Sequence, residues 1–219
     1  MKVCTDSCVF GAYIAQKIAD GAIKPKNILD IGAGTGLLSL MLAQKSTANI
    51  EGVEIDENAF VQSRENLLAS PWNDRLKVFH SDIKKLDRSF KYDLIISNPP
   101  FFENDLKPQQ KNKISAKHDE SLDLVELMAA IKNHITNEGK FAIMIPSFRI
   151  EYFKTLAEKN RFFIEEELLL RHSISHTPFR GILLAGQKKA SSKTTELVIK
   201  KNDGAYSDRF ISLLKDYYL

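Results

Sequence analysis

The segment LDIGAGTG, residues 29–36, constrains the fold of this chain more than any other part of the sequence. Gly32, Gly34 and Gly36 follow an apolar run that predicts a strand over 27–31 and precede one that predicts a helix over 37–45. Glycines there allow a sharp turn and a close approach of the backbone to a ligand. The dinucleotide fingerprint would require a third glycine where this chain has Leu37, which counts against a nicotinamide-dependent oxidoreductase.

The rest of the chain continues the alternation of strands and helices. We expect strands at 49–56, 76–83, 92–100 and 139–145, and helices at 7–18, 57–70, 122–135, 150–159 and 206–219. This order predicts a parallel sheet with crossover helices. Long apolar runs at 162–175 and 179–189 predict an antiparallel hairpin with a turn near Thr177-Pro178, and a shorter strand follows at 195–200. A length of 219 residues suits a single domain, 1–219.

Composition excludes several classes of protein. The net charge is only +3, which does not by itself argue for a nucleic-acid partner. Cys4 and Cys8 match neither a disulfide framework nor a four-ligand zinc site, so we expect free thiols and no metal. The first residues lack the pattern of a signal peptide, and no stretch approaches eighteen apolar residues. These features predict a cytoplasmic protein with no membrane association.

Acidic side chains stand at the ends of three successive predicted strands. Asp30 precedes the glycine turn, Glu54 lies among the last residues of the second strand and Asp82 among the last residues of the third. The carboxyl ends of parallel strands meet at one crevice, where open α/β sheets bind ligands. Asp30 would repel a pyrophosphate but suits the ammonium of an amino-acid-bearing cofactor. Glu54 could accept both hydroxyls of a ribose, Asp82 could accept from an adenine amino group, and Ile83 could pack on the ring.

The motifs DIGAGTG, VEID, HSDI and NPPF, in this order and spacing, resemble class I S-adenosylmethionine-dependent methyltransferases that act on planar amino groups. The resemblance implies a Rossmann-like α/β fold with a seven-stranded, mostly parallel sheet, a C-terminal antiparallel hairpin and helices on both faces. It implies S-adenosylmethionine as cofactor. Asp30, Gly32, Gly34 and Gly36 would hold its methionine end, Glu54 its ribose and Asp82 its adenine.

The segment Ser97–Phe102, SNPPFF, ends the fourth strand in a way that strand physics does not explain. An aromatic amino group is a poor nucleophile because its lone pair is delocalised. Asn98 Oδ1 and the Pro99 carbonyl could accept its two hydrogens, Pro100 would fix the backbone, and Phe101 could stack on the base. The same acceptors suit adenine N6, cytosine N4, guanine N2 and a glutamine amide, so the motif does not choose a substrate.

Further segments resemble the bacterial tRNA(Val) (adenine-N6)-methyltransferase family over roughly residues 2–146: MKVCTDSCVFGAYI, LLSLMLAQK, ASPWNDRLKV and YDLIISNPPFF. The resemblance implies methylation of the adenosine next to the anticodon of a valine tRNA. It also implies that residues 1–26 cover the cofactor, with Lys2, Thr5 and Asp6 closing the pocket. The chain departs from the family pattern at Cys4 and Ser7, where glycines are usual, and at Phe101, where tyrosine is common.

A tRNA partner would need a basic surface near the target base. The loop over 103–120 contains Lys107, Lys111, Lys113 and Lys117, and Phe102 beside it favours an unstacked base. A second basic group lies at Lys188, Lys189, Lys193, Lys200 and Lys201. We expect no obligate protein partner. Guanine-N2 methylation of ribosomal RNA, glutamine-N5 methylation of a protein and a non-catalytic RNA-binding module remain alternatives.

Overall fold

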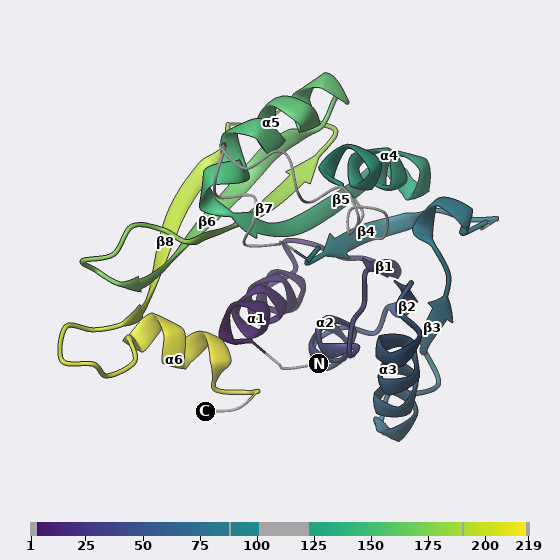
Figure 1. Cartoon of the computed structure of the whole chain (residues 1–219), viewed down its shortest axis with the longest axis horizontal. Coiled ribbons are helices and arrows are strands. Elements are labelled where there is room, and N and C mark those ends of the chain that lie inside the picture. The colour runs from purple at the N-terminus through teal and green to yellow at the C-terminus, as the bar shows by residue number, and fades with distance from the viewer. Residues whose placement is uncertain (1–3, 88, 101–122, 190, 218–219) are drawn as a thin grey trace, which may run out of the picture.

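A single mixed sheet organises the chain. The computed structural model describes residues 4–87, 89–100, 123–189 and 191–217. In this part of the chain, eight strands form a sheet in the order β3-β2-β1-β4-β5-β7-β6-β8 (Figure 1). The strands are β1 (Asn27–Ile31), β2 (Asn49–Glu54), β3 (Leu76–His80), β4 (Tyr92–Ser97), β5 (Ile135–Pro146), β6 (Phe163–Ser173), β7 (Arg180–Gly186) and β8 (Lys193–Lys200).

The first five strands are mutually parallel, and β7 pairs antiparallel with both β5 and β6. The predicted C-terminal hairpin is therefore confirmed. The sheet has eight strands rather than the predicted seven, because β8 adds to the outer side of β6 in parallel. Its side chains Leu197 and Ile199 are buried in the same apolar cluster as those of β6, which gives this edge strand its place in the sheet.

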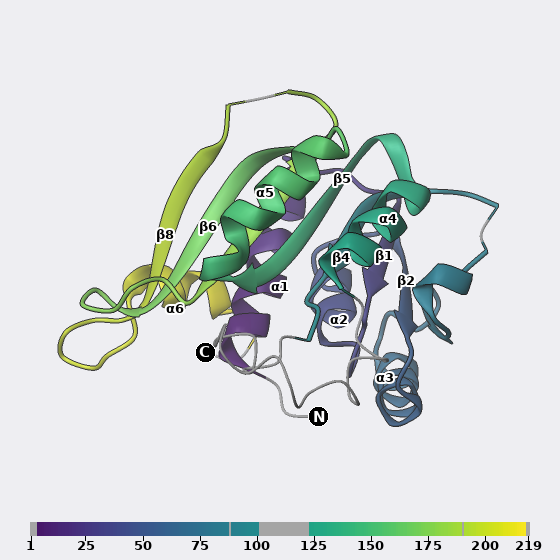
Figure 2. The ribbon, with the colours of Figure 1, turned by 45° about the horizontal axis from the view of Figure 1, so that its top comes forward.

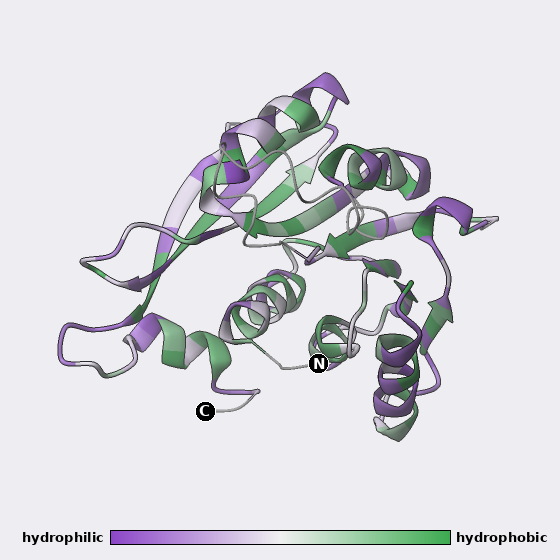
Figure 3. Cartoon of the chain, viewed as in Figure 1, coloured by the Kyte–Doolittle hydropathy of each residue, from purple (hydrophilic) through white to green (hydrophobic). Residues whose placement is uncertain are grey.

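Helices cover both faces of the sheet, as expected where central strands such as β1 and β4 are buried along nearly their whole length (Figures 1 and 2). On one face lie α1 (Thr5–Ala19), α2 (Leu37–Ala43), α3 (Glu57–Ala69) and α6 (Asp208–Leu214). On the other lie α4 (Leu124–His134) and α5 (Ile150–Lys159). Neighbouring residues of β1 separate the two cores, since Ile28 joins the first cluster and Leu29 the second. Colouring by hydropathy shows green along the central strands and purple mainly on the outer sides of the helices (Figure 3).

Helix α1 begins at Thr5, two residues before the predicted start. Its N-cap is Cys4, which makes no side-chain capping bond. The side chains of Asp6 and Ser7, within the first turn, contact Arg180 and Asn98 respectively. Residues 8–15 are all buried, so this part of the segment predicted to cover a cofactor, 1–26, belongs to the core.

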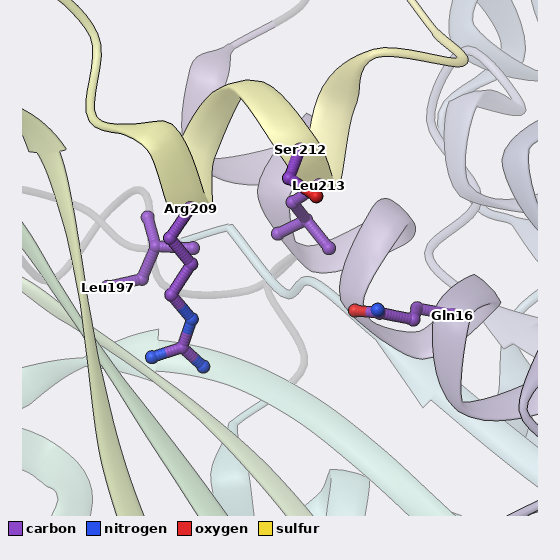
Figure 4. A pocket seen from close by; sticks show the side chains of 5 residues that line it. All are labelled: Gln16, Leu197, Arg209, Ser212 and Leu213. Atoms are coloured by element: carbon purple, nitrogen blue, oxygen red, sulfur yellow. The ribbon is translucent and has the colours of Figure 1, made fainter.

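A surface cavity of about 290 Å³ lies between α1, β8 and α6 (Figure 4). Gln16, Leu197, Arg209, Ser212 and Leu213 line it. Gln16 stands nine residues along α1 from Ser7, roughly 13 Å at the rise of an α-helix. This cavity shares no residue with the strand ends described below. Among the described residues, no helix is long and apolar enough to cross a membrane.

Candidate active site

The glycine turn joins β1 to α2 in a conformation that needs glycine. Gly32, Gly34 and Gly36 have φ angles of 73°, 57° and 78°, all in the left-handed region. The amides of Gly32 and Ala33 both donate to the Val53 carbonyl, at 2.9 and 3.1 Å. The turn is therefore attached to the end of β2 as well as to β1.

Two of these glycines face different surroundings. A Cβ added at Gly32 would meet no atom within 4 Å, whereas one at Gly36 would lie 2.8 Å from Ser63 Oγ and 3.2 Å from Leu67 Cδ2. Gly36 thus allows α2 and α3 to pack closely. Gly32 leaves open space beside the carboxyl end of β1, where a ligand could approach the backbone.

Asp30 is fully buried at the end of β1. Ser39 Oγ of α2 donates to its Oδ2 at 2.8 Å, while Oδ1 has no hydrogen-bond partner among the described residues. Burial, together with the nearby charge of Glu54, raises the pKa of Asp30 to about 7, and the Ser39 hydrogen bond opposes that rise. The sequence predicts this carboxylate at the mouth of the turn; in the structure it is fully buried within β1. A buried carboxyl oxygen of this kind suits a cationic donor.

Glu54, at the end of β2, accepts three backbone hydrogen bonds. Gly34 N donates to its Oε2 at 2.7 Å, and Ile55 N and Asp56 N each donate to its Oε1 at 2.9 Å. A carboxylate offers roughly four acceptor positions. The side chain therefore holds the glycine turn against β2 and retains acceptor capacity for one hydroxyl, fewer than the two expected from the sequence.

Asp82 and Ile83 follow β3 at the same edge of the sheet, because Ser81 N donates to the Glu54 carbonyl at 3.0 Å. Asp82 caps the short helix η1 (Ile83–Lys85) by accepting from Lys84 N at 2.9 Å. Its Oδ2 lies 3.8 Å from Lys84 Nζ, which also pairs with Glu126 of α4 at 3.1 Å. Ile83 is buried in the α4 and α5 core. Asp82 thus has a structural partner in addition to any ligand.

Asn98 and Pro99 leave β4 directly beside the glycine turn. Ile31 of β1 pairs in register with Ser97, and Ser97 Oγ donates to the Ile31 carbonyl at 2.8 Å. Gly32 and Asn98 are the residues that directly follow the ends of β1 and β4. Pro99 is buried and Pro100 exposed. The amide of Asn98 donates from Nδ2 to Ser7 Oγ of α1 at 2.9 Å. This contact could not be predicted from local sequence patterns, because the two residues are 91 positions apart.

Of the remaining predicted site residues, Thr5 lies in the first turn of α1, two residues from Ser7, and the others lie outside the described residues. Thr5 is exposed as the first residue of α1. Phe101, Phe102, Lys107, Lys111, Lys113 and Lys117 lie outside the described residues, as does the whole 103–120 loop. The second basic group does not form one patch: Lys193 and Lys200 stand at opposite ends of β8, and Lys188 pairs with Glu138 at 2.5 Å. Sequence reasoning also missed Ser39, which gave no pattern linking it to Asp30.

Comparison with known proteins places this geometry in a class. The solved structure of a predicted O-methyltransferase from Agrobacterium tumefaciens matches with a TM-score of 0.70 at 15% identity, over 95% of this chain and 94% of that one. A magnesium protoporphyrin IX methyltransferase from Synechocystis, solved with bound S-adenosylmethionine, matches with a TM-score of 0.59 at 16% identity, over 82% and 78%. The fold is that of the class I methyltransferases.

The family follows from sequence similarity. Residues 11–164 match the model of the methyltransferase small domain, and the chain belongs to this family. A relative from Dyadobacter fermentans, named tRNA1(Val) (adenine(37)-N6)-methyltransferase, is 42% identical over 224 residues, which cover 100% of this chain and 91% of the relative.

The residues at this edge fit S-adenosylmethionine. The ligand carries an ammonium, a ribose and an adenine, and the site offers a buried carboxyl oxygen at Asp30, a hydroxyl acceptor at Glu54 and open space over Gly32. Among the described residues, no group of three or more His, Cys, Asp or Glu side chains could hold a metal ion.

Replacing two glycines of the turn by alanine should separate binding from stability. Gly32→Ala should cost roughly 1 kcal/mol of unfolding free energy from backbone strain, and weaken S-adenosylmethionine binding by roughly tenfold or more, because its methyl group enters the open space. Gly36→Ala should cost roughly 2–4 kcal/mol, since overpacking against α3 adds to the strain. Urea unfolding and titration calorimetry measure both. Equal losses of stability in the two variants would contradict this assignment.

Proposed function

We propose that this protein methylates the N6 amino group of adenine 37, the adenosine next to the anticodon, in tRNA1(Val), with S-adenosylmethionine as methyl donor. Membership of the methyltransferase small domain family supports the reaction, and the name of the 42% identical relative supports the substrate. The observation that carries the proposal is the register of β1 with β4, which sets Asn98 beside Gly32.

That register supports separate positions for the methyl donor and the target base. β1 lies between β2 and β4, so Glu54 borders the glycine turn on one side and Asn98 borders it on the other. In our proposal, the cofactor occupies the β1, β2 and β3 ends and the target base occupies the β4 end. The transfer distance is thus set by neighbouring strands rather than by a mobile connection.

We assign the cofactor contacts as follows. Asp30 Oδ1 accepts from the ammonium, Glu54 Oε2 accepts from one ribose hydroxyl, and the turn backbone at Gly32, Gly34 and Gly36 approaches the methionine part. Asp82 accepts from the adenine amino group beside Ile83, and Thr5 helps to close the pocket. When bound, S-adenosylmethionine supplies a methyl group carried on a sulfonium.

Asn98 and Pro99 orient the target amine. Among the described residues, nothing donates to Asn98 Oδ1, so this atom and the Pro99 carbonyl are available as acceptors. Accepting both N–H groups favours the pyramidal nitrogen, whose lone pair is free of the ring, and stabilises the positive charge that develops on it. Pro100 fixes the backbone after Pro99. We assign stacking on the base to Phe101.

We place RNA contacts on Phe102 and on the loop lysines Lys107, Lys111, Lys113 and Lys117. Phosphate attraction by lysines gives affinity without sequence choice, so these residues would support binding rather than recognition. A tRNA substrate places the activity in the cytoplasm, and we propose that the protein acts without a protein partner.

The raised pKa of Asp30 predicts how cofactor binding depends on pH. An ammonium prefers the ionised carboxyl, so affinity should rise as pH passes upward through about 7. S-adenosylmethionine should bind roughly fivefold more tightly at pH 7.5 than at pH 6, a gain limited by loss of the ligand's own ammonium proton near pH 7.8. Asp30→Asn should bind roughly tenfold or more weakly and lose this rise. A pH-independent wild-type affinity in titration calorimetry would exclude the contact.

The raised pKa of Asp30 also predicts how the stability of the cofactor-free protein depends on pH. The folded protein retains the Asp30 proton, which the unfolded chain releases above pH 3.8, so this residue makes stability fall as pH rises from about 4 to about 7. Asp30→Asn keeps an acceptor for Ser39 and removes the buried charge. Its midpoint of thermal unfolding at pH 8 should exceed the wild-type value by at least about 2 °C.

Removing the acceptor amide of Asn98 should lower the rate of methyl transfer and leave the affinity for the cofactor unchanged. Asn98→Ala should lower kcat by roughly 10²–10³-fold, the usual loss for one group that stabilises developing charge. Its Kd for S-adenosylmethionine should stay within about twofold of wild type. Asn133→Ala, at an exposed position in α4, serves as the control. Parallel loss of cofactor binding in Asn98→Ala would refute the role.

Methyl transfer from labelled S-adenosylmethionine tests the function as a whole. The purified protein is given unmodified total tRNA, with ribosomal RNA and protein extract as parallel acceptors, and the products are digested for nucleoside mass spectrometry. We expect N6-methyladenosine in tRNA1(Val). Label in N2-methylguanosine or in protein would keep the methyl-transfer reaction but show that the proposed substrate is wrong. Cofactor binding without label in any acceptor would favour a non-catalytic RNA-binding protein.

A further inference from the structure

The hydrogen bond between Asn98 and Ser7 links the proposed acceptor amide to a different part of the chain. Asn98 Nδ2 donates to Ser7 Oγ at 2.9 Å, in a partly buried environment. Ser7 lies in the first turn of α1, and Asn98 follows the last residue of β4. The family model begins at residue 11, so the matched region does not contain Ser7.

The first turn of α1 is firmly supported. Asp6 Oδ2 pairs with Arg180 Nε of β7 at 3.1 Å, and Asp6 Oδ1 accepts from Ser7 N at 3.0 Å. Arg180 in turn pairs in register with Pro146, the last residue of β5. The buried residues 8–15 fix the helix behind this turn. The Ser7 hydroxyl is therefore held in place relative to the ends of β4, β5 and β7.

This support bears on which way the amide of Asn98 faces. An amide presents an acceptor on one side and a donor on the other, and its terminal torsion is broad and roughly two-fold. A flipped amide would direct N–H groups at the N–H groups of the target amine, and the reaction would lose its acceptor. In the structure Nδ2 lies toward the Ser7 hydroxyl and donates to it, and in this orientation Oδ1 is directed away from α1.

We propose that Ser7 is a positioning residue, which holds the Asn98 amide with its oxygen available to the target amine. The inference rests on the proposed function, in which Asn98 Oδ1 accepts from that amine. Ser7 touches neither the methyl donor nor the base in this account. It acts only through Asn98, so its loss should lower the rate of methyl transfer and spare the affinity for the cofactor.

Kinetics of four variants test the coupling. Ser7→Ala should lower the single-turnover rate at saturating cofactor and tRNA by roughly 2–10-fold, the factor that one ordinary hydrogen bond supplies. Ser7→Thr, which restores a hydroxyl, should recover the rate to within about twofold. Ser212→Ala, in the exposed part of α6, should match wild type. In an Asn98→Ala background, Ser7→Ala should have no further effect.

An equal loss from Ser7→Ala with and without Asn98 would overturn the proposal, as would failure of Ser7→Thr to recover the rate. So would an unchanged rate accompanied by weaker cofactor binding, because that result would assign Ser7 to the cofactor pocket. The kinetic experiment requires that tRNA1(Val) is the substrate. A second measurement, made on the protein alone, does not.

Nuclear magnetic resonance of the side-chain amide of Asn98 provides that readout in the protein alone. The signal is assigned by its absence in Asn98→Ala. In Ser7→Ala we expect its nitrogen and proton shifts to move and its hydrogen exchange to accelerate, and in Ser7→Thr we expect wild-type values. An Asn98 signal indifferent to Ser7→Ala overturns the proposal whatever the substrate. A responsive signal, with no methyl transfer by the wild-type protein to any acceptor, overturns the proposed function and leaves the contact standing.

Discussion

The carboxylate of Glu54 holds the candidate site together. By accepting from Gly34, Ile55 and Asp56, it fixes the glycine turn to the end of β2. The glycine turn borders the open space above Gly32. Because β4 pairs with β1, Asn98 lies beside this space. Charge-assisted hydrogen bonds to backbone amides are among the stronger contacts of a protein interior. The binding edge is therefore organised before any ligand arrives.

In the proposed function, a second acid, Asp30, gives the site its preference for a positively charged ligand group. It is fully buried near Glu54, and burial with that neighbouring charge raises its pKa to about 7. An isolated buried carboxylate is costly, and the cost falls when a cation approaches its unpartnered oxygen. The site is thus poised for a ligand that brings a positive group to β1 and hydroxyl groups to β2. This combination fits the cofactor of the class I methyltransferases.

Much of the fold and the positions of the strand-end residues could be predicted, because the sequence patterns that indicate them are local. Glycine spacing, an acid at each strand end and the prolines after β4 can be read from short segments, and parallel strands bring such ends together. The contacts between distant segments were not predictable. Ser7 meets Asn98, and Asp6 meets Arg180, only because α1 packs across the sheet. The eighth strand was also missed in the strand count, since its place beside β6 depends on burial of Leu197 rather than on its own pattern.

The most direct test of this account is a pH titration of the Asp30 side-chain carboxyl by carbon-13 nuclear magnetic resonance, without and with S-adenosylmethionine. The signal is assigned with Asp30→Asn. We predict a midpoint near pH 7 in the free protein and a shift well below that when the cofactor is bound, because the ammonium stabilises the ionised form. A free-protein midpoint near pH 4, or one that S-adenosylmethionine leaves in place, would contradict the claim that this buried carboxyl receives the cofactor's ammonium.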